Sequence, residues 1–149
     1  MSTRIDIFED DFDAGAEIAA LKAQAGGAGA IATFTGYVRG EANLKALTLE
    51  HYPAMTAREI ARHVAEAKRR WPLLGVRVIH RVGRLVPGAQ IVFVAVASAH
   101  RAAAFDACAF IMDYLKVHAP FWKQEEYDDG VRWVDAKASD DDAAAKWKR

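Results

Sequence analysis

Residues 100–136, HRAAAFDACAFIMDYLKVHAPFWKQEEYDDGVRWVDA, decide the fold class of this chain. Apolar side chains recur at helical spacing through the first half of the stretch, and they predict a helix over residues 100–118 that Pro120 brings to an end. The second half predicts a β-hairpin, because two β-prone runs flank a turn at residues 128–130. A helix that leads into an antiparallel hairpin indicates an α+β protein.

The segments before this stretch alternate between strands and helices. Further helices are predicted at residues 11–25 and 53–71. Strands, including those of the hairpin, are predicted at residues 30–39, 44–52, 76–82, 91–98, 121–127 and 131–136. With one more strand ahead of the first helix, this order predicts a single α+β domain with three main helices and mostly antiparallel sheets. We place the domain at residues 1–138 and expect a flexible, charged tail at residues 139–149.

Composition narrows the class of function. Lys plus Arg and Asp plus Glu both number 20, so the formal net charge is zero, unlike the basic excess of a general nucleic-acid binder. No apolar run approaches the roughly 20 residues that span a bilayer, and the N-terminus lacks the pattern of a signal peptide. The single cysteine, Cys108, cannot form an internal disulfide. We therefore expect a cytoplasmic protein that binds neither nucleic acid nor membrane.

The third predicted helix carries two cations inside its apolar face. On a helical wheel that face is formed by Phe105, Cys108, Ala109, Met112 and Leu115. Arg101 and Lys116 fall within it, so they either snorkel to water or reach a cavity that receives an anion.

Because Pro120 breaks the helix after Lys116, the next strand can bring Lys123 to the same pocket. Arg101 and His100 lie a full helix length away, so only a neighbouring element or subunit could bring them there. Two further cations could join such a site: Arg39 and Lys137.

No side chain shows the pattern of a nucleophile or of a metal ligand. Cys108 falls in mid-helix among apolar residues, where a core role is expected, and Ser98 is better explained as a helix N-cap. The five histidines do not have metal-ligand spacing. We expect His63 on the wet face of its helix and His80 on an edge strand. From the residues alone, the chain is a soluble α+β domain with a cationic pocket whose chemistry stays open.

Five motifs follow one another in order along the chain. They are LTLEHYP at residues 47–53, VIHRVG at 78–83, SAHR at 98–101, DYLK at 113–116 and APFWK at 119–123. The series resembles the molybdopterin synthase large-subunit family, and the similarity runs from about residue 5 to residue 136. The resemblance implies an α+β fold with a hammerhead-like β element. It also implies a homodimer of large subunits with one small subunit at each end, which together make a heterotetramer.

The resemblance further implies a sulfurtransferase of molybdenum cofactor biosynthesis. In that family, cyclic pyranopterin monophosphate becomes molybdopterin, whose dithiolene later binds molybdenum. The sulfur comes from the C-terminal Gly-Gly thiocarboxylate of a small ubiquitin-like subunit, whose tail enters the large subunit's pocket. Two such subunits are used in succession. The missing nucleophile is then explained, because the attacking sulfur belongs to the partner, and no cofactor or metal ion of the chain's own is expected.

Carried over residue by residue, the resemblance makes Lys116 and Lys123 the catalytic residues. We assign Lys116 to the thiocarboxylate and Lys123 to proton transfer or polarisation at the pterin side chain. The substrate-binding positions are Tyr37, Val38, Arg39, His100, Arg101, Gln124, Glu125 and Lys137. The pocket walls are Phe34 and Met112, for both of which a plain core role is an equal alternative.

Three departures from the family pattern affect this carry-over. The link between Arg39 and Leu44 is short, which changes the loop near the pocket. Gln124 stands where a basic residue is common. Lys137 occupies the place of an arginine expected to reach across the dimer, and it lacks the bidentate guanidinium fork for phosphate.

Three other functions compete with this one. A non-catalytic module that senses phosphate or nucleotide would use the same cations, and it would tolerate loss of either lysine. A scaffold subunit would bind partner proteins without binding a pterin. A self-contained transferase would use Cys108, and blocking that thiol would abolish its activity.

Overall fold

The computed structural model describes residues 2–118, 121–134 and 145–147. The helices of this part are α1 (Ala14–Gln24), α2 (Pro53–Arg70) and α3 (Arg101–Val117). Its strands are β1 (Ser2–Phe8), β2 (Ala30–Tyr37), β3 (Leu44–His51), β4 (Leu73–Arg81), β5 (Gly83–Leu85), β6 (Gln90–Ser98), β7 (Phe121–Tyr127) and β8 (Gly130–Val134). The predicted helices and strands are confirmed to within a few residues; β5 is a short addition that the sequence analysis did not foresee.

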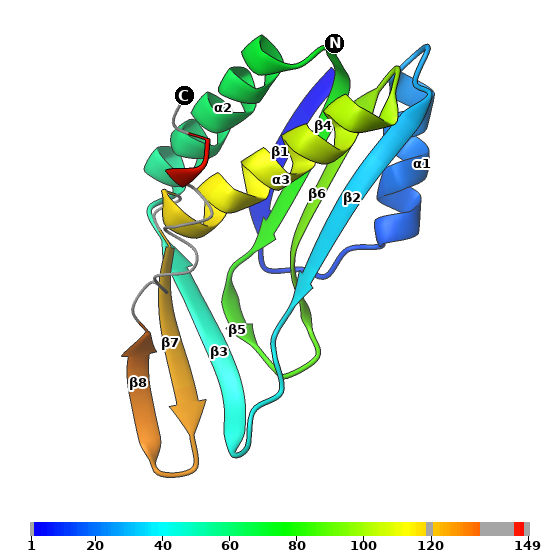
Figure 1. Cartoon of the computed structure of the whole chain (residues 1–149). Helices are drawn as coiled ribbons and strands as arrows, with labels where there is room; N and C mark the ends of the chain where they lie inside the picture. The colour runs from blue at the N-terminus through cyan, green and yellow to red at the C-terminus, as the bar shows by residue number, and fades with distance from the viewer. Residues whose placement is uncertain (1, 119–120, 135–144, 148–149) are drawn as a thin grey trace.

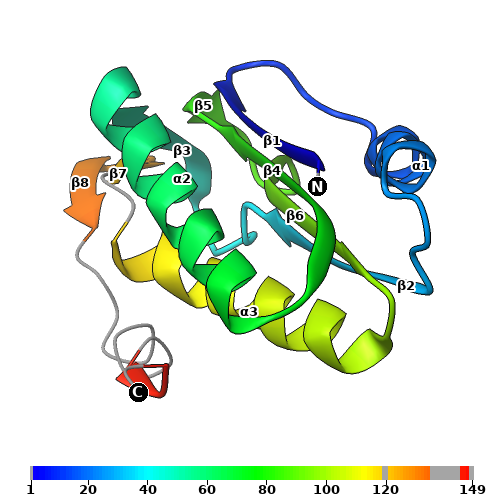
Figure 2. The ribbon, with the colours of Figure 1, turned by 90° about the horizontal axis from the view of Figure 1, so that it is seen from above.

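The first sheet forms the centre of the molecule. Its strand order is β1-β4-β6-β2, with β1 parallel to β4 and the other pairs antiparallel. Figures 1 and 2 show α2 and α3 on one face and α1 on the other. Because both faces are covered, β4 and β6 are apolar along most of their length rather than alternating with polar residues. Val78 and Val94 face α2 and α3, whereas Ile79 and Phe93 face α1.

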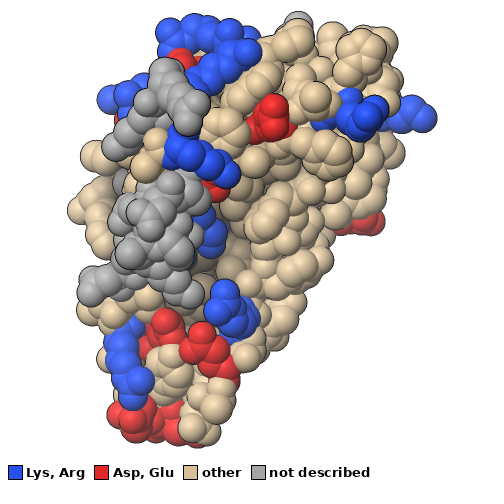
Figure 3. Space-filling view, in the orientation of Figure 1, with Lys and Arg blue, Asp and Glu red and all other residues tan. Residues whose placement is uncertain are grey.

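The second sheet extends away from the helices (Figure 1). Its order is β5-β3-β7-β8 and every pair is antiparallel. Its small core consists of Val38, Leu49 and Leu85. Figure 3 shows Lys and Arg gathered over α2 and acidic side chains at the tip of the β7–β8 hairpin. On this face, basic and acidic side chains therefore gather in different places.

The helix boundaries follow from local chemistry. Asp13 caps α1, because its Oδ1 accepts a hydrogen bond from the Ala16 amide at 3.1 Å. Pro53 opens α2, where a missing N–H costs nothing. His100 occupies the N-cap position of α3, although its side chain makes no capping hydrogen bond, so the prediction of Ser98 as a cap was wrong. The Ser98 hydroxyl instead donates to the Pro72 carbonyl at 2.8 Å and joins the loop after α2 to the sheet.

The buried face of α3 is rotated from the predicted one. Cys108, Met112 and Leu115 are buried as expected, but Phe105 is 63% exposed and Ala109 is exposed too. Their places in the core are taken by Ala104, Ala107, Phe110 and Ile111. The reason is that α3 packs against α2 as well as against the first sheet. Its buried face is therefore turned toward both α2 and the sheet.

The proposed boundary at residue 138 falls outside the described residues and stays a prediction. Of the tail, residues 145–147 are described. The indole N–H of Trp147 donates to the Asp113 carboxylate at 2.6 Å, and its ring contacts Trp71 and Phe110 edge to face. No described helix is both long and apolar enough to cross a membrane.

Candidate functional site

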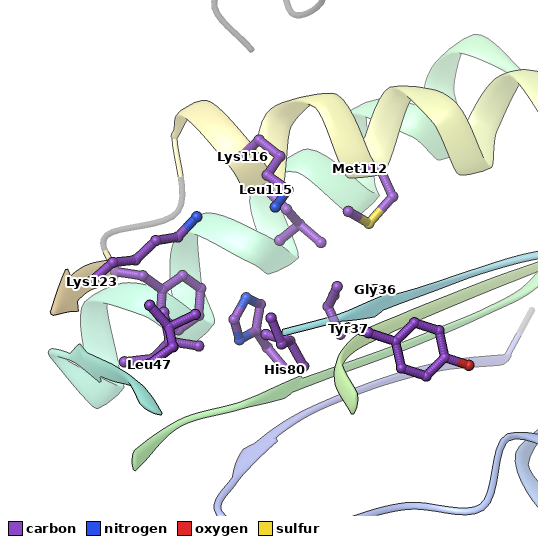
Figure 4. A pocket seen from close by; sticks show the side chains of 12 residues that line it. Gly36, Tyr37, Leu47, His80, Met112, Leu115, Lys116 and Lys123 are labelled. Carbon is purple, nitrogen blue, oxygen red and sulfur yellow. The ribbon is translucent and has the colours of Figure 1, made fainter. Parts of the chain in front are cut away.

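A cavity of about 80 Å³ lies where the C-terminal end of α3 meets both sheets (Figure 4). Most of its lining is apolar, with Leu49 and Leu115 among the side chains that surround it. The ionisable side chains in the described lining are Tyr37, His80, Lys116 and Lys123. A small apolar cavity with a few convergent polar groups is the usual form of a ligand site.

The two lysines reach this cavity from different elements. Lys116 lies in the last turn of α3, where the buried neighbours Met112 and Leu115 fix the helix against the cavity. Lys123 lies on β7 and pairs in register with Leu49 of β3, which is another lining residue. Side chains alternate along a strand, so Phe121 and Lys123 share the cavity side. Figure 4 shows both amino groups turned toward the same space, as the sequence predicted.

The pKa of His80 reflects the burial and the positive charge of the cavity. The pKa of His80 is lowered to about 4. Burial is the largest cause, and the positive charges of Lys116 and Lys123 contribute to the same shift. The imidazole is therefore neutral near pH 7, and the lysines supply the positive charge. Within the described part of the chain, Lys116 has no ion pair with a carboxylate, so its charge acts on whatever enters the cavity. This arrangement favours an anionic group.

The prediction that His80 lies on an edge strand was wrong. It lies on β4, which is flanked by β1 and β6, so it is not on an edge strand, and it is only 8% exposed. Its ring stacks on Phe121, with centroids 3.9 Å apart. The signal that could have revealed this site residue is a histidine at the end of the apolar run of β4.

Four of the predicted site residues line the cavity: Tyr37, Met112, Lys116 and Lys123. Tyr37 is at its edge, with a ring that points away from the lysines (Figure 4). The neighbouring Val38 is buried in the small core of the second sheet instead, and Arg39 follows β2 on the surface. Their substrate-binding roles stay predictions.

The remaining predicted residues lie elsewhere in a single chain. His100 and Arg101 are exposed at the other end of α3, roughly 22 Å from Lys116 along the helix axis. Gln124 and Glu125 lie on β7 outside the cavity lining, and Glu125 accepts a hydrogen bond from the Tyr127 hydroxyl. Phe34 is partly exposed on β2 and does not line the cavity. Lys137 lies outside the described residues. The roles of these residues also stay predictions.

Cys108 is a core residue, as predicted. It is buried on α3, and burial raises the pKa of its thiol to about 11, so the reactive thiolate is not populated near pH 7. It does not line the cavity. Among the described residues, no three His, Cys, Asp or Glu side chains are grouped to hold a metal ion.

The prediction for His63 was wrong. The residue faces inward on α2, 8% exposed, because α3 crosses α2 at this turn. Its ring lies 4.4 Å from that of Tyr114 and 5.3 Å from that of His118, measured between centroids. Burial, helped by nearby positive charge, lowers its pKa to about 4. His63 is a packing residue that stays neutral at physiological pH.

Fold and cavity together define an α+β protein with a mostly apolar cavity that contains two lysines. The family model described as MoaE protein matches residues 7–118, and the chain belongs to this family. A molybdopterin synthase catalytic subunit from Pseudomonas aeruginosa is 53% identical over 140 residues, covering 92% of this chain and 93% of that protein. One from Salmonella typhimurium is 54% identical over 148 residues, covering 97% and 98%.

Solved structures agree with this assignment. A molybdopterin biosynthesis MoaE protein from Burkholderia ambifaria has a TM-score of 0.86 and 52% identity, covering 100% of this chain and 99% of that one. A molybdopterin synthase structure from Staphylococcus aureus has a TM-score of 0.80 and 27% identity, covering 87% and 95%. The family and the α+β fold class that the sequence predicted are therefore confirmed.

Proposed function

We propose that the chain is the catalytic subunit of a molybdopterin synthase, which transfers sulfur to cyclic pyranopterin monophosphate to form the dithiolene of molybdopterin. The observation that carries this proposal is the meeting of Lys116 and Lys123 in one cavity of a MoaE-family chain. Two cations in a mostly apolar cavity suit a reaction between anionic reactants, because each charge is stronger where water is excluded.

The sulfur is supplied by a small ubiquitin-like partner with a C-terminal Gly-Gly thiocarboxylate. Two features support this part of the proposal. The described residues that line the cavity include no Cys, Ser or Thr, so they offer neither a thiol that could carry the sulfur nor an aliphatic hydroxyl nucleophile. The cavity, at about 80 Å³, is also smaller than the roughly 300–1,000 Å³ of ordinary small-molecule sites, and a narrow glycine tail suits it better than a whole pterin does.

The lysines divide the work between the two reactants. The Lys116 ammonium binds the thiocarboxylate, and Lys123 transfers a proton to the pterin side chain or polarises it. His100, Arg101 and Lys137 hold the phosphate only if a second copy of the chain brings them to the cavity. The functional unit is accordingly a homodimer with two small subunits, a heterotetramer.

Two further features belong to the same proposal. The chain binds no cofactor or metal ion of its own, because the sulfur arrives on the partner and the lysines handle charge and protons. Its location is the cytoplasm, where thiols stay reduced, and this agrees with a lone cysteine that is a free, buried thiol.

The test is reconstitution with purified components. The native chain, thiocarboxylated small subunit and cyclic pyranopterin monophosphate are mixed, and the dithiolene product is followed over time. We expect product from the native chain and at least about a tenfold lower rate for Lys116→Ala and for Lys123→Ala, since each removes a charged contact worth roughly 1.5–3 kcal/mol. The matched control is Lys22→Ala, in the last turn of α1 on the far face of the first sheet, which should be as active as native.

Two results would overturn the proposal or its site. Absence of product from a native chain that binds the small subunit would leave a binding or scaffold function. Full activity in both cavity variants would keep the synthase but remove the lysines from its mechanism.

A further inference from the structure

His80 occupies a central place in the cavity although no role has been assigned to it. It lines the same cavity as Lys116 and Lys123, and it comes from β4, the strand below the end of α3. Figure 4 shows its imidazole below Lys116 and to the right of Lys123. A polar ring in a mostly apolar lining needs a partner for each polar atom.

The orientation and tautomer of the ring are fixed. Nδ1 lies 2.8 Å from the carbonyl oxygen of Arg81, and because a carbonyl only accepts, Nδ1 must carry the proton. One face of the ring is covered by Phe121, with an interplanar angle of 18°. Nε2 is then the polar atom that His80 offers to the cavity, and in the neutral ring it carries a lone pair.

The charged surroundings keep the ring neutral. The ionisable groups that face it are Lys116 on α3, Lys123 on β7 and His51 on β3, and each opposes a positive charge on the imidazole. Burial opposes it most strongly, and the pKa of His80 falls to about 4. At neutral pH Nε2 therefore accepts hydrogen bonds and does not donate them.

We propose that His80 is a positioning residue: when an anion enters the cavity, its Nε2 accepts a hydrogen bond from the Lys116 ammonium and holds that group against the anion. This inference rests on the proposed function for the identity of the anion, the thiocarboxylate of the partner. Lys116 is the choice because Figure 4 shows its amino group reaching down from α3 above the imidazole, and its charge also lowers the pKa of His80. A flexible four-carbon chain carries the Lys116 charge, so a fixed acceptor restricts where that charge lies.

Two substitutions separate this role from simple packing. His80→Asn keeps a donor near the Arg81 carbonyl but leaves nothing at the position of Nε2. His80→Gln carries its amide to the position of Nε2, where the side-chain oxygen accepts a hydrogen bond. In the reconstituted reaction we expect His80→Gln to keep kcat within about threefold of native and His80→Asn to lower it at least about tenfold, the cost of one hydrogen bond to a charged group. An Asn variant as active as the Gln variant, or more active, would overturn the proposal.

A second readout keeps His80 in place and needs no activity. The imidazole nitrogens are followed by NMR through a pH titration of the native chain, Lys116→Ala and Lys123→Ala. We expect the midpoint of His80 to rise in both variants and to rise more in Lys116→Ala. An equal or smaller rise in Lys116→Ala would show that Lys116 is not the partner. If the native chain makes no product, the proposed function fails, and the titration still decides which of the two lysines acts more strongly on His80.

Discussion

The two sheets of this molecule differ in how far their side chains are buried. The difference indicates that the first sheet supplies most of the stability, whereas the second mainly contributes to the site. In the first sheet, β4 and β6 bury nearly every side chain between helices on both faces. In the second sheet, β7 has only partly buried or exposed side chains, and β8 is mostly exposed. The candidate site lies between them, with His80 supplied by the first sheet and Lys123 by the second. A well-buried sheet thus forms one side of the cavity, while the other side is formed by a sheet with little core of its own.

The largest expected effect is in the core of the first sheet. Phe93 on β6 is fully buried and its ring contacts that of Phe12. Phe93→Ala should lower the free energy of unfolding by about 3–5 kcal/mol, because apolar contact is lost and a cavity is left behind. Denaturant unfolding followed by circular dichroism measures this. A loss below about 1 kcal/mol would show that the first sheet is not the main source of stability.

A somewhat smaller effect is expected from a buried cation on the same sheet. Arg77 is buried on β4 and forms ion pairs with Asp6 at 2.9 Å and with Glu17 of α1 at 2.8 Å. Arg77→Met keeps most of the volume but leaves both carboxylates without this partner. We expect a loss of about 2–4 kcal/mol in the same unfolding experiment. An unchanged stability would mean that water replaces the guanidinium at no cost.

The pH dependence of stability reports on two buried histidines, His80 at the cavity and His63 between α2 and α3. His63 and His80 have a pKa of about 4 in the folded chain, below the value of 6.5 expected in the unfolded chain. Between these values the unfolded state binds more protons, so stability should be full above about pH 6.5 and should fall as the pH drops toward 4. The loss is on the order of 1–3 kcal/mol per histidine. His80→Gln should remove its share of this slope, and an unaltered slope would contradict the assignment.

The smallest effect is expected at the edge of the second sheet. Trp133 on β8 is 62% exposed, so Trp133→Ala removes little buried surface. The free energy of unfolding should change by less than about 0.5 kcal/mol. A loss as large as that of Phe93→Ala would abolish the distinction between the two sheets.

What the sequence predicted depended on how local the relevant contacts are. Lys116 and Lys123 are close in the chain and separated by a proline, so their meeting in one cavity could be expected from a helix end and the next strand. The helix and strand positions were likewise predicted from periodicity within each segment. The family was predicted from motifs spread along the chain.

The errors concern contacts between distant segments. His80 was expected on an edge strand, but β1 pairs with β4 in parallel, which moves β4 to the interior of the sheet. His63 was expected in water, but α3 crosses α2 and covers it. The exposed Phe105 has the same origin, because the packing of α3 against α2 rotates its buried face. None of these facts can be read from the spacing of residues within a single element.

The most direct test of the central claim is a double-mutant cycle on the two lysines. The rate of dithiolene formation is measured for the native chain, Lys116→Ala, Lys123→Ala and the double variant, with intact folding checked by circular dichroism. If both lysines act on one reaction in one cavity, the double variant should be about as slow as the slower single variant, because residues that act as a unit are not additive. Losses that multiply would show that the two lysines contribute independently of each other and would contradict their action as one unit.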